Sequence, residues 1–269
     1  MYSKYHGCGN DFIIGKYQSG NDYSLLARKY CDRHLGIGAD GLLLVEKENN
    51  NITMHLYNSD GSIAPMCGNG IRCFANYCLD EGLINENDFI VNTLSGPMRI
   101  IIESRDPFFC KVNLGKPDFS SEKLSIDTKK NVFIDEKLKV NDIDVSVSAV
   151  YMATHHLVIL VNDLNKAIES KIAEVIAENK IFLVGINVNL VEIIDRKNIK
   201  MKTFERGAGW TLACGTGASA AYSVLRKKNL CDNELSVHLE LGILKITSIN
   251  DEIIMSGPSK CVAKEVKFV

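Results

Sequence analysis

A five-residue pattern that occurs twice is the strongest constraint on how this chain can fold. Met66-Cys67-Gly68-Asn69-Gly70 returns as Ala213-Cys214-Gly215-Thr216-Gly217, with the two cysteines 147 residues apart. That separation is about one domain length, and the 269 residues of the whole chain fit about two domains. Each copy is followed by an apolar stretch that contains alanine, which we interpret as a buried helix with little polar surface. The repeat therefore predicts a two-domain chain with one Cys-Gly turn and one buried helix in each part.

The remaining segments alternate strand and helix signals. Short apolar or alternating runs predict strands at 11–14, 41–45, 52–57, 89–91, 98–102, 182–194 and 200–204. A turn at Ser95-Gly96-Pro97 makes 89–102 a predicted hairpin. A helix is expected from Tyr23 to His34, and a longer one from its N-cap Asp163 through Ile176. The polar segment Leu114–Glu122 contains Gly and Pro and lies near the middle, so it is the predicted linker.

The repeated turn has a definite chemical capacity. A thiol just before a helix lies beside the positive end of the helix dipole and several unpaired N–H groups, which lower a thiol pKa from about 8.5 toward neutrality. The glycines let a ligand approach the backbone and leave first-turn amides free to bind a carboxylate. Two such turns facing each other would place one sulfur on each side of a bound molecule. That arrangement suits removal of a proton from one face of a stereocentre and its return to the other face.

Composition narrows the classes of partner. Lys+Arg 31 against Asp+Glu 33 gives a net charge of −2, so the chain lacks the positive field that favours nucleic acid or anionic membranes. We expect a small-molecule partner, with no nucleic acid and no membrane.

No apolar run approaches the roughly 18 residues that span a bilayer, and the N-terminus lacks the apolar core of a signal peptide, so a cytoplasmic location is expected. The nine cysteines include no C-x-x-C pair and no zinc spacing, which predicts reduced, mostly buried thiols and no metal site.

Other interpretations of the cysteines remain open at this stage. A Cys-Gly pair before an Ala-rich helix is often only a packed turn, although two copies one domain apart favour a paired site. A dithiol redox pair is less favoured because no resolving cysteine lies nearby in sequence. A nucleophilic cysteine paired with His155 or His156 would explain one copy and leave the other unexplained. For His156 we favour a structural role.

Several motifs together resemble one known family. They are Lys4 to Phe12 (KYHGCGNDF), Gly36 to Gly41 (GIGADG), Asn58 to Gly70, Asn187-Val188-Asn189, and Glu205 to Gly217. In this combination the chain resembles the diaminopimelate epimerase family over nearly its whole length. The resemblance implies an α+β fold of two pseudo-symmetric domains, each a curved mixed β-sheet wrapped around a central helix, with the active site in the interdomain cleft. It implies an N-terminal domain at 1–115, to which residues 259–269 return, and a C-terminal domain at 116–258.

The resemblance also assigns roles to residues. It implies amino-acid racemisation or epimerisation without pyridoxal phosphate or any other cofactor, with Cys67 and Cys214 as the two acid/base thiols. The amides of Gly68, Asn69, Gly215 and Thr216 would hold the carboxylate at the reacting carbon. The matching positions for the distal end of diaminopimelate are Asn10, Asn58, Asn187, Glu205 and Arg206. Without the family, each Asn would be interpreted as a turn or strand-end residue and Glu205-Arg206 as a surface ion pair. A homodimer is expected by analogy alone.

Two positions depart from the family pattern. Thr154 stands where the family has the Asn of Gly-Asn-Pro-His, and Trp210 stands where Gly-Ala-Gly-Glu-Thr has its Glu. Loss of polar partners for a second ammonium-carboxylate group, with an added aromatic surface, should disfavour diaminopimelate and could favour an apolar, aromatic or imidazole side chain. The alternative for Trp210 is plain packing behind the second turn.

These departures set the order of the functional predictions. The sequence predicts an amino-acid racemase with altered substrate choice, with histidine as a candidate substrate. The first alternative is a true diaminopimelate epimerase, and the second is a non-catalytic amino-acid-binding relative whose site Trp210 plugs.

Overall fold

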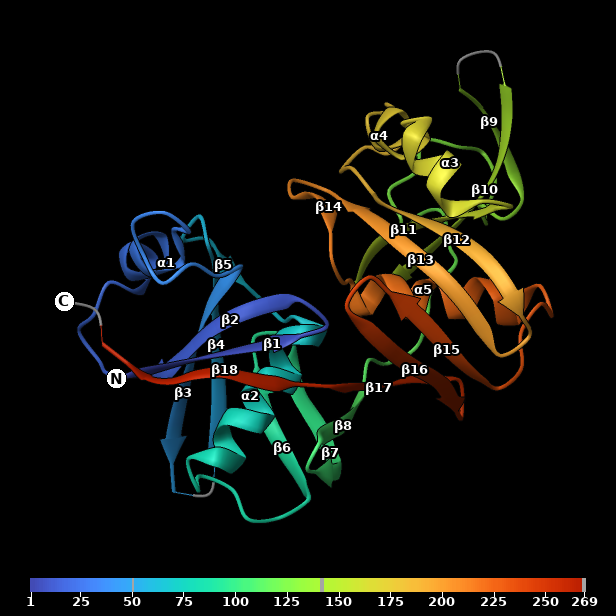
Figure 1. The fold of residues 1–269 in the computed structure, drawn as a ribbon. Helices are drawn as coiled ribbons and strands as arrows, with labels where there is room; N and C mark the ends of the chain where they lie inside the picture. Colours follow the sequence, from blue (N-terminus) through green and yellow to red (C-terminus); the bar gives the residue numbers. More distant parts are fainter. Residues whose placement is uncertain (50, 141–142, 268–269) are drawn as a thin grey trace. The chain divides into compact units, whose positions relative to one another are not determined.

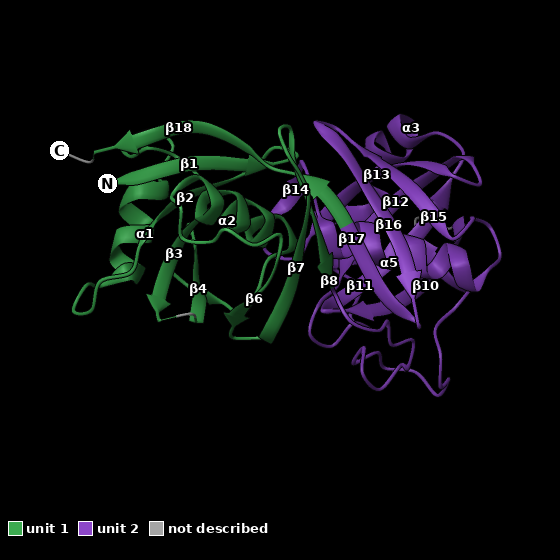
Figure 2. Ribbon diagram, turned by 90° about the horizontal axis from the view of Figure 1, so that it is seen from below, with its two compact units in different colours: residues 1–113, 256–269 green, residues 114–255 purple. Residues whose placement is uncertain are grey.

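The short apolar runs of the sequence form the strands of mixed sheets in a computed structural model that describes residues 1–49, 51–140 and 143–267. The chain divides into two units (Figures 1 and 2). Unit 1 contains residues 1–113 and the chain from residue 256 onward, and unit 2 contains residues 114–255. Strand β17 (Glu252–Pro258) begins in unit 2 and ends in unit 1.

Unit 1 carries one mixed set of paired strands and two helices. In chain order its elements are β1 (Tyr2–Gly7), β2 (Asn10–Lys16), α1 (Tyr23–Cys31), β3 (Gly41–Glu48), β4 (Asn51–Asn58), β5 (Ile63–Ala64), α2 (Gly68–Asp80), β6 (Asp88–Thr93), β7 (Gly96–Arg105), β8 (Phe108–Asn113) and β18 (Lys260–Val266). The pairing runs β18-β1-β2-β3-β4-β6-β7-β8, with β5 also on β4. Only β2–β3 and β4–β6 are parallel within this series.

Unit 2 has the same kinds of connection. Its elements are β9 (Glu136–Val140), β10 (Ile143–Met152), β11 (Thr154–Val161), α3 (Leu164–Glu169), α4 (Ile172–Ala177), β12 (Asn187–Asp195), β13 (Asn198–Glu205), β14 (Gly209–Thr211), α5 (Gly215–Lys227), β15 (Glu234–Leu239) and β16 (Gly242–Ile249). The pairing runs β9-β10-β11-β12-β13-β15-β16, with β14 also on β13. Here β11–β12 and β13–β15 are the parallel pairs.

The two units are therefore copies of one topology. Strands β1 to β4 of unit 1 correspond to β10 to β13 of unit 2, β5 to β14, α2 to α5, and β6 and β7 to β15 and β16. The registers agree as well: Phe12 lies opposite Gly41 on the parallel pair β2–β3, as His156 lies opposite Asn187 on β11–β12. This register makes Phe12 the equivalent of His156. The predicted α+β fold of two pseudo-symmetric domains is confirmed at the level of topology.

Each unit is organised around one buried helix. Helix α2 contacts β1, β2, β3, β8 and β18, and its residues from Gly68 to Cys78 are buried. Helix α5 contacts β10, β11, β12 and β16, and it is buried from Gly217 to Leu225. Figure 2 shows α2 among the strands of unit 1 and α5 among those of unit 2. The apolar stretches after the two Cys-Gly turns are thus buried helices, as predicted, because they have little polar surface to present to solvent.

Helix boundaries follow capping chemistry, with one correction. Asp163 is an N-cap as predicted, since its side chain accepts a hydrogen bond from the amide of Lys166. The long helix expected through Ile176 is wrong: Lys171 has a left-handed φ of 56°, which separates α3 from α4. The interruption lets the apolar side chains Ala173 and Ile176 pack into the core of unit 2. The expected helix from Tyr23 ends at Cys31, three residues early.

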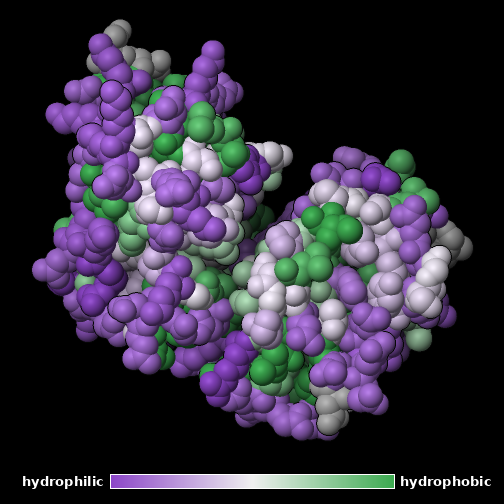
Figure 3. Space-filling model, turned by 180° about the vertical axis from the view of Figure 1, so that it is seen from behind, coloured by the Kyte–Doolittle hydropathy of each residue, from purple (hydrophilic) through white to green (hydrophobic). Residues whose placement is uncertain are grey.

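The strand expected at 182–194 is wrong in its first five residues, because β12 begins at Asn187, after Gly185 with its left-handed φ of 74°. Two further expectations about structure are met. Strands β6 and β7 form the predicted antiparallel hairpin. All nine cysteines are free, and seven of them are buried. The face shown in Figure 3 carries mainly hydrophilic residues with hydrophobic ones between them, as expected where most large apolar side chains are packed inside. No helix in the described ranges is both long and apolar enough to cross a membrane.

Candidate active site

The two cysteines of the repeated pattern have the same backbone role. Cys67 precedes α2 and Cys214 precedes α5, each as an N-cap in extended conformation, with φ of −138° and −129°. Both helices have 13 residues and begin at the first glycine of the pattern. Each sulfur therefore lies at the positive end of a helix dipole, where negative charge is stabilised.

The second glycine of each pattern leaves room for the neighbouring side chains. A methyl group on Gly217 would collide with Oδ1 of Asn189 and lie 3.2 Å from Sγ of Cys214. A methyl group on Gly70 would lie 3.3 Å from both Cβ of Cys67 and the ring of Phe12. Close approach of side chains to the first helical turn thus favours glycine at both positions, and the approach is closer in unit 2.

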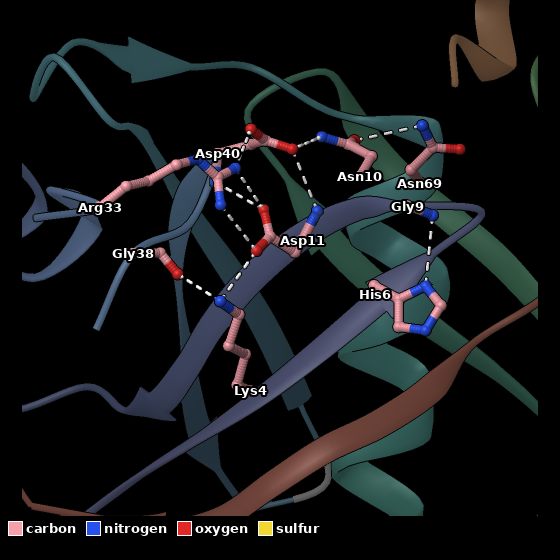
Figure 4. A network of polar contacts seen from close by, with 9 residues as sticks. All are labelled: Lys4, His6, Gly9, Asn10, Asp11, Arg33, Gly38, Asp40 and Asn69. Carbon is pink, nitrogen blue, oxygen red and sulfur yellow. Dashed lines mark hydrogen bonds and ion pairs between the residues drawn. The ribbon is translucent and has the colours of Figure 1, made fainter. Parts of the chain in front are cut away.

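Asn10 lies beside Cys67. Figure 4 shows the charged network that holds its amide. Its Nδ2 donates to Oδ2 of Asp40 at 2.6 Å, and its Oδ1 accepts from Nδ2 of Asn69 at 3.1 Å. The sulfur of Cys67 lies 3.7 Å from the same Oδ1. Because a carboxylate only accepts hydrogen bonds, Asp40 sets the orientation of the Asn10 amide. The network therefore turns an amide oxygen toward Cys67.

Arg33 connects the two carboxylates behind Asn10. Its guanidinium donates to Asp11 at 2.8 and 3.2 Å and to Asp40 at 2.7 Å, and Lys4 contacts Asp11 at 2.9 Å. Burial alone would raise the pKa of Asp11, but the hydrogen bonds and charges of Arg33 and Lys4 hold that pKa below its ordinary value. Sequence reasoning gave these residues no role. Asp11 and Asp40 did stand in the motifs KYHGCGNDF and GIGADG, next to Asn10 and the start of β3.

In unit 2, a chain of side chains leads from the interior to Cys214. Oγ1 of Thr216 lies 3.5 Å from Sγ of Cys214 and 3.0 Å from Nε2 of His156. Nδ1 of His156 lies 3.3 Å from Nδ2 of Asn189, whose Oδ1 accepts from Thr203 at 3.0 Å. His156, Asn189 and Thr203 are buried. Burial, followed by the neighbouring His155, lowers the pKa of His156 from 6.5 to about 3, so its ring is neutral near neutral pH.

The sequence analysis predicted only part of this series of hydrogen-bonded side chains. His156 was expected to be structural, and Thr216 was proposed for its backbone amide alone. Asn189 stood in the motif Asn187-Val188-Asn189 without a role. The alternation of that strand was an available signal, because residues two apart on a strand share one face. His156 contacts Thr216 in the described hydrogen bonds, which gives no support to a cysteine-histidine nucleophilic pair.

Two asparagines predicted for the distal group, Asn58 and Asn187, have hydrogen-bond partners within their own units. Asn58 donates to Oγ of Ser62 at 2.9 Å in an exposed turn at the end of β4. Asn187 is buried, donates to the carbonyl of His155 and accepts from the amide of Arg206, both at 2.9 Å. Asn58 thus makes a contact within its own turn, whereas Asn187 bonds to backbone groups 32 and 19 residues away in the sequence.

The side chains of Glu205 and Arg206 each bond to another residue. Oε1 of Glu205 accepts from Oγ1 of Thr211 at 2.7 Å, and the guanidinium of Arg206 donates to the carbonyl of Val184. The register of β13 places Glu205 and Thr203 on one face, together with Thr211 of β14. This face is the one that presents Thr203 to Asn189 and the first turn of α5.

Trp210 lies on the opposite face of the same strands. It pairs with Phe204, the two rings meet edge to face at 5.5 Å, and both pack against the core of unit 2. Its Nε1 donates to Oε1 of Glu174 in α4 at 2.9 Å. Within unit 2 this is the packing role that was weighed as the alternative to a role in substrate choice. Thr154, the other departure, begins β11 and is half-buried.

The comparisons with known proteins agree with this architecture. The sequence profile of the diaminopimelate epimerase family matches residues 2–120 and 148–262. A diaminopimelate epimerase of Caldanaerobacter subterraneus subsp. tengcongensis is 39% identical over 260 residues, which cover 95% of each chain. One of Clostridium perfringens is 38% identical over 263 residues, again covering 95% of each chain.

Solved structures share the fold at much lower identity. A Bacillus anthracis phenazine biosynthesis protein of the PhzF family has a TM-score of 0.70 at 18% identity, covering 97% of this chain and 96% of that one. A hydroxyproline epimerase of Agrobacterium vitis has a TM-score of 0.66 at 12% identity, covering 97% of this chain and 89% of that one. At these identities the likeness concerns the fold.

Fold and sequence matches together define an isomerase, in the class of epimerases and racemases that work without pyridoxal phosphate. Within that class, the chain belongs to the diaminopimelate epimerase family. The family resemblance expected from the motifs is confirmed.

Proposed function

We propose that this protein inverts the α-carbon of an amino acid, with Cys67 and Cys214 as its two acid/base groups. The observation that carries the proposal is the shared position of the two thiols, each an extended N-cap of a buried 13-residue helix in one copy of a duplicated unit. The thiolate of one cysteine takes the α-proton, and the thiol of the other donates its proton to the opposite face. No oxidant, reductant or cofactor enters this exchange. The proposal requires both helix N-termini to face one substrate.

The same two turns supply donors for the substrate carboxylate. The α-hydrogen of an amino acid is a weak acid, so charge that grows on the carboxylate must be stabilised in the transition state. We assign this role to the backbone amides of Gly68, Asn69, Gly215 and Thr216, which belong to the first turns of α2 and α5. Preorganised donors of this kind contribute about 2.7–4 kcal/mol each in a site without water.

Diaminopimelate is the first candidate substrate. The relatives that match over nearly the whole chain are named diaminopimelate epimerases. The chain also carries the matching residues Asn10, Asn58, Asn187, Glu205 and Arg206. With this substrate, the reaction interconverts the LL and meso forms.

A different free amino acid, such as histidine, is the second candidate. Thr154 favours it, because a threonine hydroxyl cannot replace both the N–H and C=O groups of the asparagine found there in the family. A distal ammonium-carboxylate group would then have fewer partners, and unpaired charges weaken binding. Trp210 gives this candidate less support, because its ring packs against Phe204 and Glu174. The contacts of Trp210 also give no support to a binding relative whose site this residue plugs.

Exchange of the α-hydrogen in deuterated water tests both candidates. The pure protein is incubated separately with LL-diaminopimelate, L-histidine and other single amino acids, and loss of the α-hydrogen signal is followed by NMR. Rapid exchange of diaminopimelate alone supports the first candidate, and rapid exchange of histidine without diaminopimelate supports the second. Absence of exchange with every amino acid contradicts the proposed function.

A further inference from the structure

The duplicated topology allows each thiol environment to be compared with its counterpart. Register places Phe12 at the position of His156, Leu43 at that of Asn189, and Leu56 at that of Thr203. All six side chains are buried. Unit 1 thus has hydrocarbon where unit 2 has a chain of hydrogen-bonded polar groups. Buried polar groups are costly unless paired, so a polar chain at positions that hydrocarbon can fill indicates a function beyond packing.

The direction of each hydrogen bond in the unit 2 chain follows from its buried end. Nδ2 of Asn189 lies 2.8 Å from the carbonyl oxygen of Leu157, which can only accept, so this atom is the amide nitrogen. The second N–H of the same group points to Nδ1 of His156 at 3.3 Å. Nδ1 is therefore an acceptor, and the neutral ring carries its proton on Nε2. That proton is donated to Oγ1 of Thr216, which leaves the hydroxyl hydrogen to be donated to Cys214.

The contacts around Cys67 have the opposite polarity. Asp40 fixes the Asn10 amide with its nitrogen toward the carboxylate, so Oδ1 of Asn10 faces the sulfur at 3.7 Å. An amide oxygen can only accept, and it therefore favours an S–H over a thiolate. The sulfur also accepts the amide N–H of Gly70 at 3.4 Å, a contact that is stronger for a thiolate and that the Asn10 oxygen must outweigh. Cys214 has no such helix-capping bond and is directed to Thr216 instead.

We propose that the free protein holds Cys214 as the thiolate and Cys67 as the thiol. The positioning residues that set this state are His156 and Thr216 beside Cys214. Beside Cys67 they are Asn10 and Asp40. This inference deepens the proposed function and rests on both cysteines being its acid/base groups. In the first half-reaction a proton leaves the α-carbon for the sulfur of Cys214, and the S–H of Cys67 gives its proton to that carbon. The mirror-image substrate is deprotonated from the Cys67 side and first requires the opposite protonation state.

The charged groups near each thiol are compatible with this assignment. Around Cys67, Asp11 and Asp40 are balanced by Lys4 and Arg33 through direct contacts, and Arg72 of α2 donates to the carbonyl of Gly68. Around Cys214, His156 is neutral, and Glu205 of β13 brings a negative charge bonded to Thr211 on the same face. The charge of Glu205 opposes a thiolate, so the Thr216 hydroxyl and the N-terminus of α5 must outweigh it.

A titration of thiolate ultraviolet absorbance tests the assignment without any substrate. Wild-type protein, Cys67→Ala and Cys214→Ala are titrated in parallel, and differences between the curves cancel the other seven cysteines. We expect the step missing from Cys214→Ala to lie at lower pH than the step missing from Cys67→Ala. Equal midpoints, or the reverse order, would overturn the proposal.

Variants of the relay test its cause. Thr216→Val keeps the backbone amide and removes the hydroxyl, which should raise the Cys214 midpoint by about one pH unit, a tenfold loss of thiolate at fixed pH. Thr216→Ser restores the hydroxyl and should return the midpoint to the wild-type value. His156→Phe copies the unit 1 residue and should raise the midpoint by a smaller amount, whereas Phe12→Leu at the equivalent position in unit 1 should leave it unchanged. An unchanged midpoint in a folded Thr216→Val protein contradicts the relay.

The titration separates this inference from the proposed function. If the midpoints differ as expected while no amino acid exchanges its α-hydrogen, the proposed function fails and the assignment of the thiolate stands. If exchange is rapid but the midpoints coincide, the proposed function stands and the assignment fails. Circular dichroism of each variant identifies proteins that do not fold, and the wild-type comparison with the two cysteine variants remains decisive if His156→Phe is one of them.

Discussion

Nε2 of His156 lies 3.0 Å from Oγ1 of Thr216, so a strand residue and a helix residue 60 positions apart share a hydrogen bond beside Cys214. The equivalent pair in unit 1 is Phe12 and Asn69, and Asn69 donates instead to Asn10. One duplicated scaffold thus presents a hydroxyl to one sulfur and an amide oxygen to the other.

Replacing His156 by phenylalanine should weaken the dependence of the free energy of unfolding on pH under acidic conditions. The pKa of His156 in the folded state is about 3, below the ordinary 6.5. Within the window between these two pH values, the unfolded chain binds a proton that the folded chain excludes. The free energy of unfolding therefore falls as pH drops through the window, by up to about 1.4 kcal/mol per pH unit from this group. Urea denaturation of wild type and His156→Phe at several pH values measures the two slopes. Parallel curves would contradict the buried neutral state.

Removing either active-site thiol should abolish inversion. Cys67→Ala and Cys214→Ala each lose one of the two acid/base groups, and a general acid or base contributes about 10²–10⁴-fold in rate. Chiral chromatography of product measures the loss. Cys261→Ala, which removes a half-exposed thiol of β18, is the matched control and should keep wild-type turnover. Near-normal inversion by either site variant would refute the assigned role of that residue.

Adding one methyl group should affect the two repeated turns unequally. Gly217→Ala forces the new methyl against Asn189, which is buried and held by Leu157 and Thr203. Gly70→Ala meets only Cβ of Cys67 and the edge of Phe12 at 3.3 Å, where small shifts suffice. We expect kcat to fall about tenfold or more in Gly217→Ala, because small displacements of reacting groups are costly, and to fall less in Gly70→Ala. Equal losses of kcat would show that the closer approach in unit 2 has no consequence.

Thr154→Asn should shift substrate preference toward diaminopimelate. The asparagine amide restores both a donor and an acceptor at the start of β11, and one hydrogen bond to a charged group is worth about 1.5–3 kcal/mol. The ratio of exchange rates for diaminopimelate and histidine should therefore rise about tenfold or more. Competition of the two substrates in one deuterated sample measures the ratio directly. An unchanged ratio would remove Thr154 from the residues that select substrate.

Trp210→Phe should alter stability without altering that ratio. The substitution removes the hydrogen bond to Oε1 of Glu174, whose Oε2 is buried without a partner among the described contacts. Leaving a buried carboxylate oxygen unpaired should lower the free energy of unfolding by about 1–3 kcal/mol. Because Trp210 is the only tryptophan, unfolding is followed by circular dichroism rather than by intrinsic tryptophan fluorescence. Glu174→Gln is the companion variant, since its amide is less costly to bury. A large change in the ratio of exchange rates would show that Trp210 takes part in substrate selection.

Local signals predicted much of the fold correctly. The spacing of apolar residues after Cys67 and Cys214 indicated two buried helices, and the side chain of Asp163 caps α3 as its residue type suggested. Periodicity failed after Ser170, because the left-handed residue Lys171 divides the expected helix, and no pattern in the sequence signalled that break. The strand alternation around Trp210 was available, but the face that it covers became clear only from the pairing with Phe204.

By itself the sequence determined the duplicated unit, the cysteine at the start of each buried helix and the family to which the chain belongs. These properties depend on residues close together in the chain, where helical and strand periodicity act. Only the tertiary structure decided which polar atom meets each sulfur, because Asn10 is 57 residues from Cys67 and His156 is 60 residues from Thr216. Hydrogen-bond polarity at such sites is set by packing between distant strands and helices, and no local pattern encodes it.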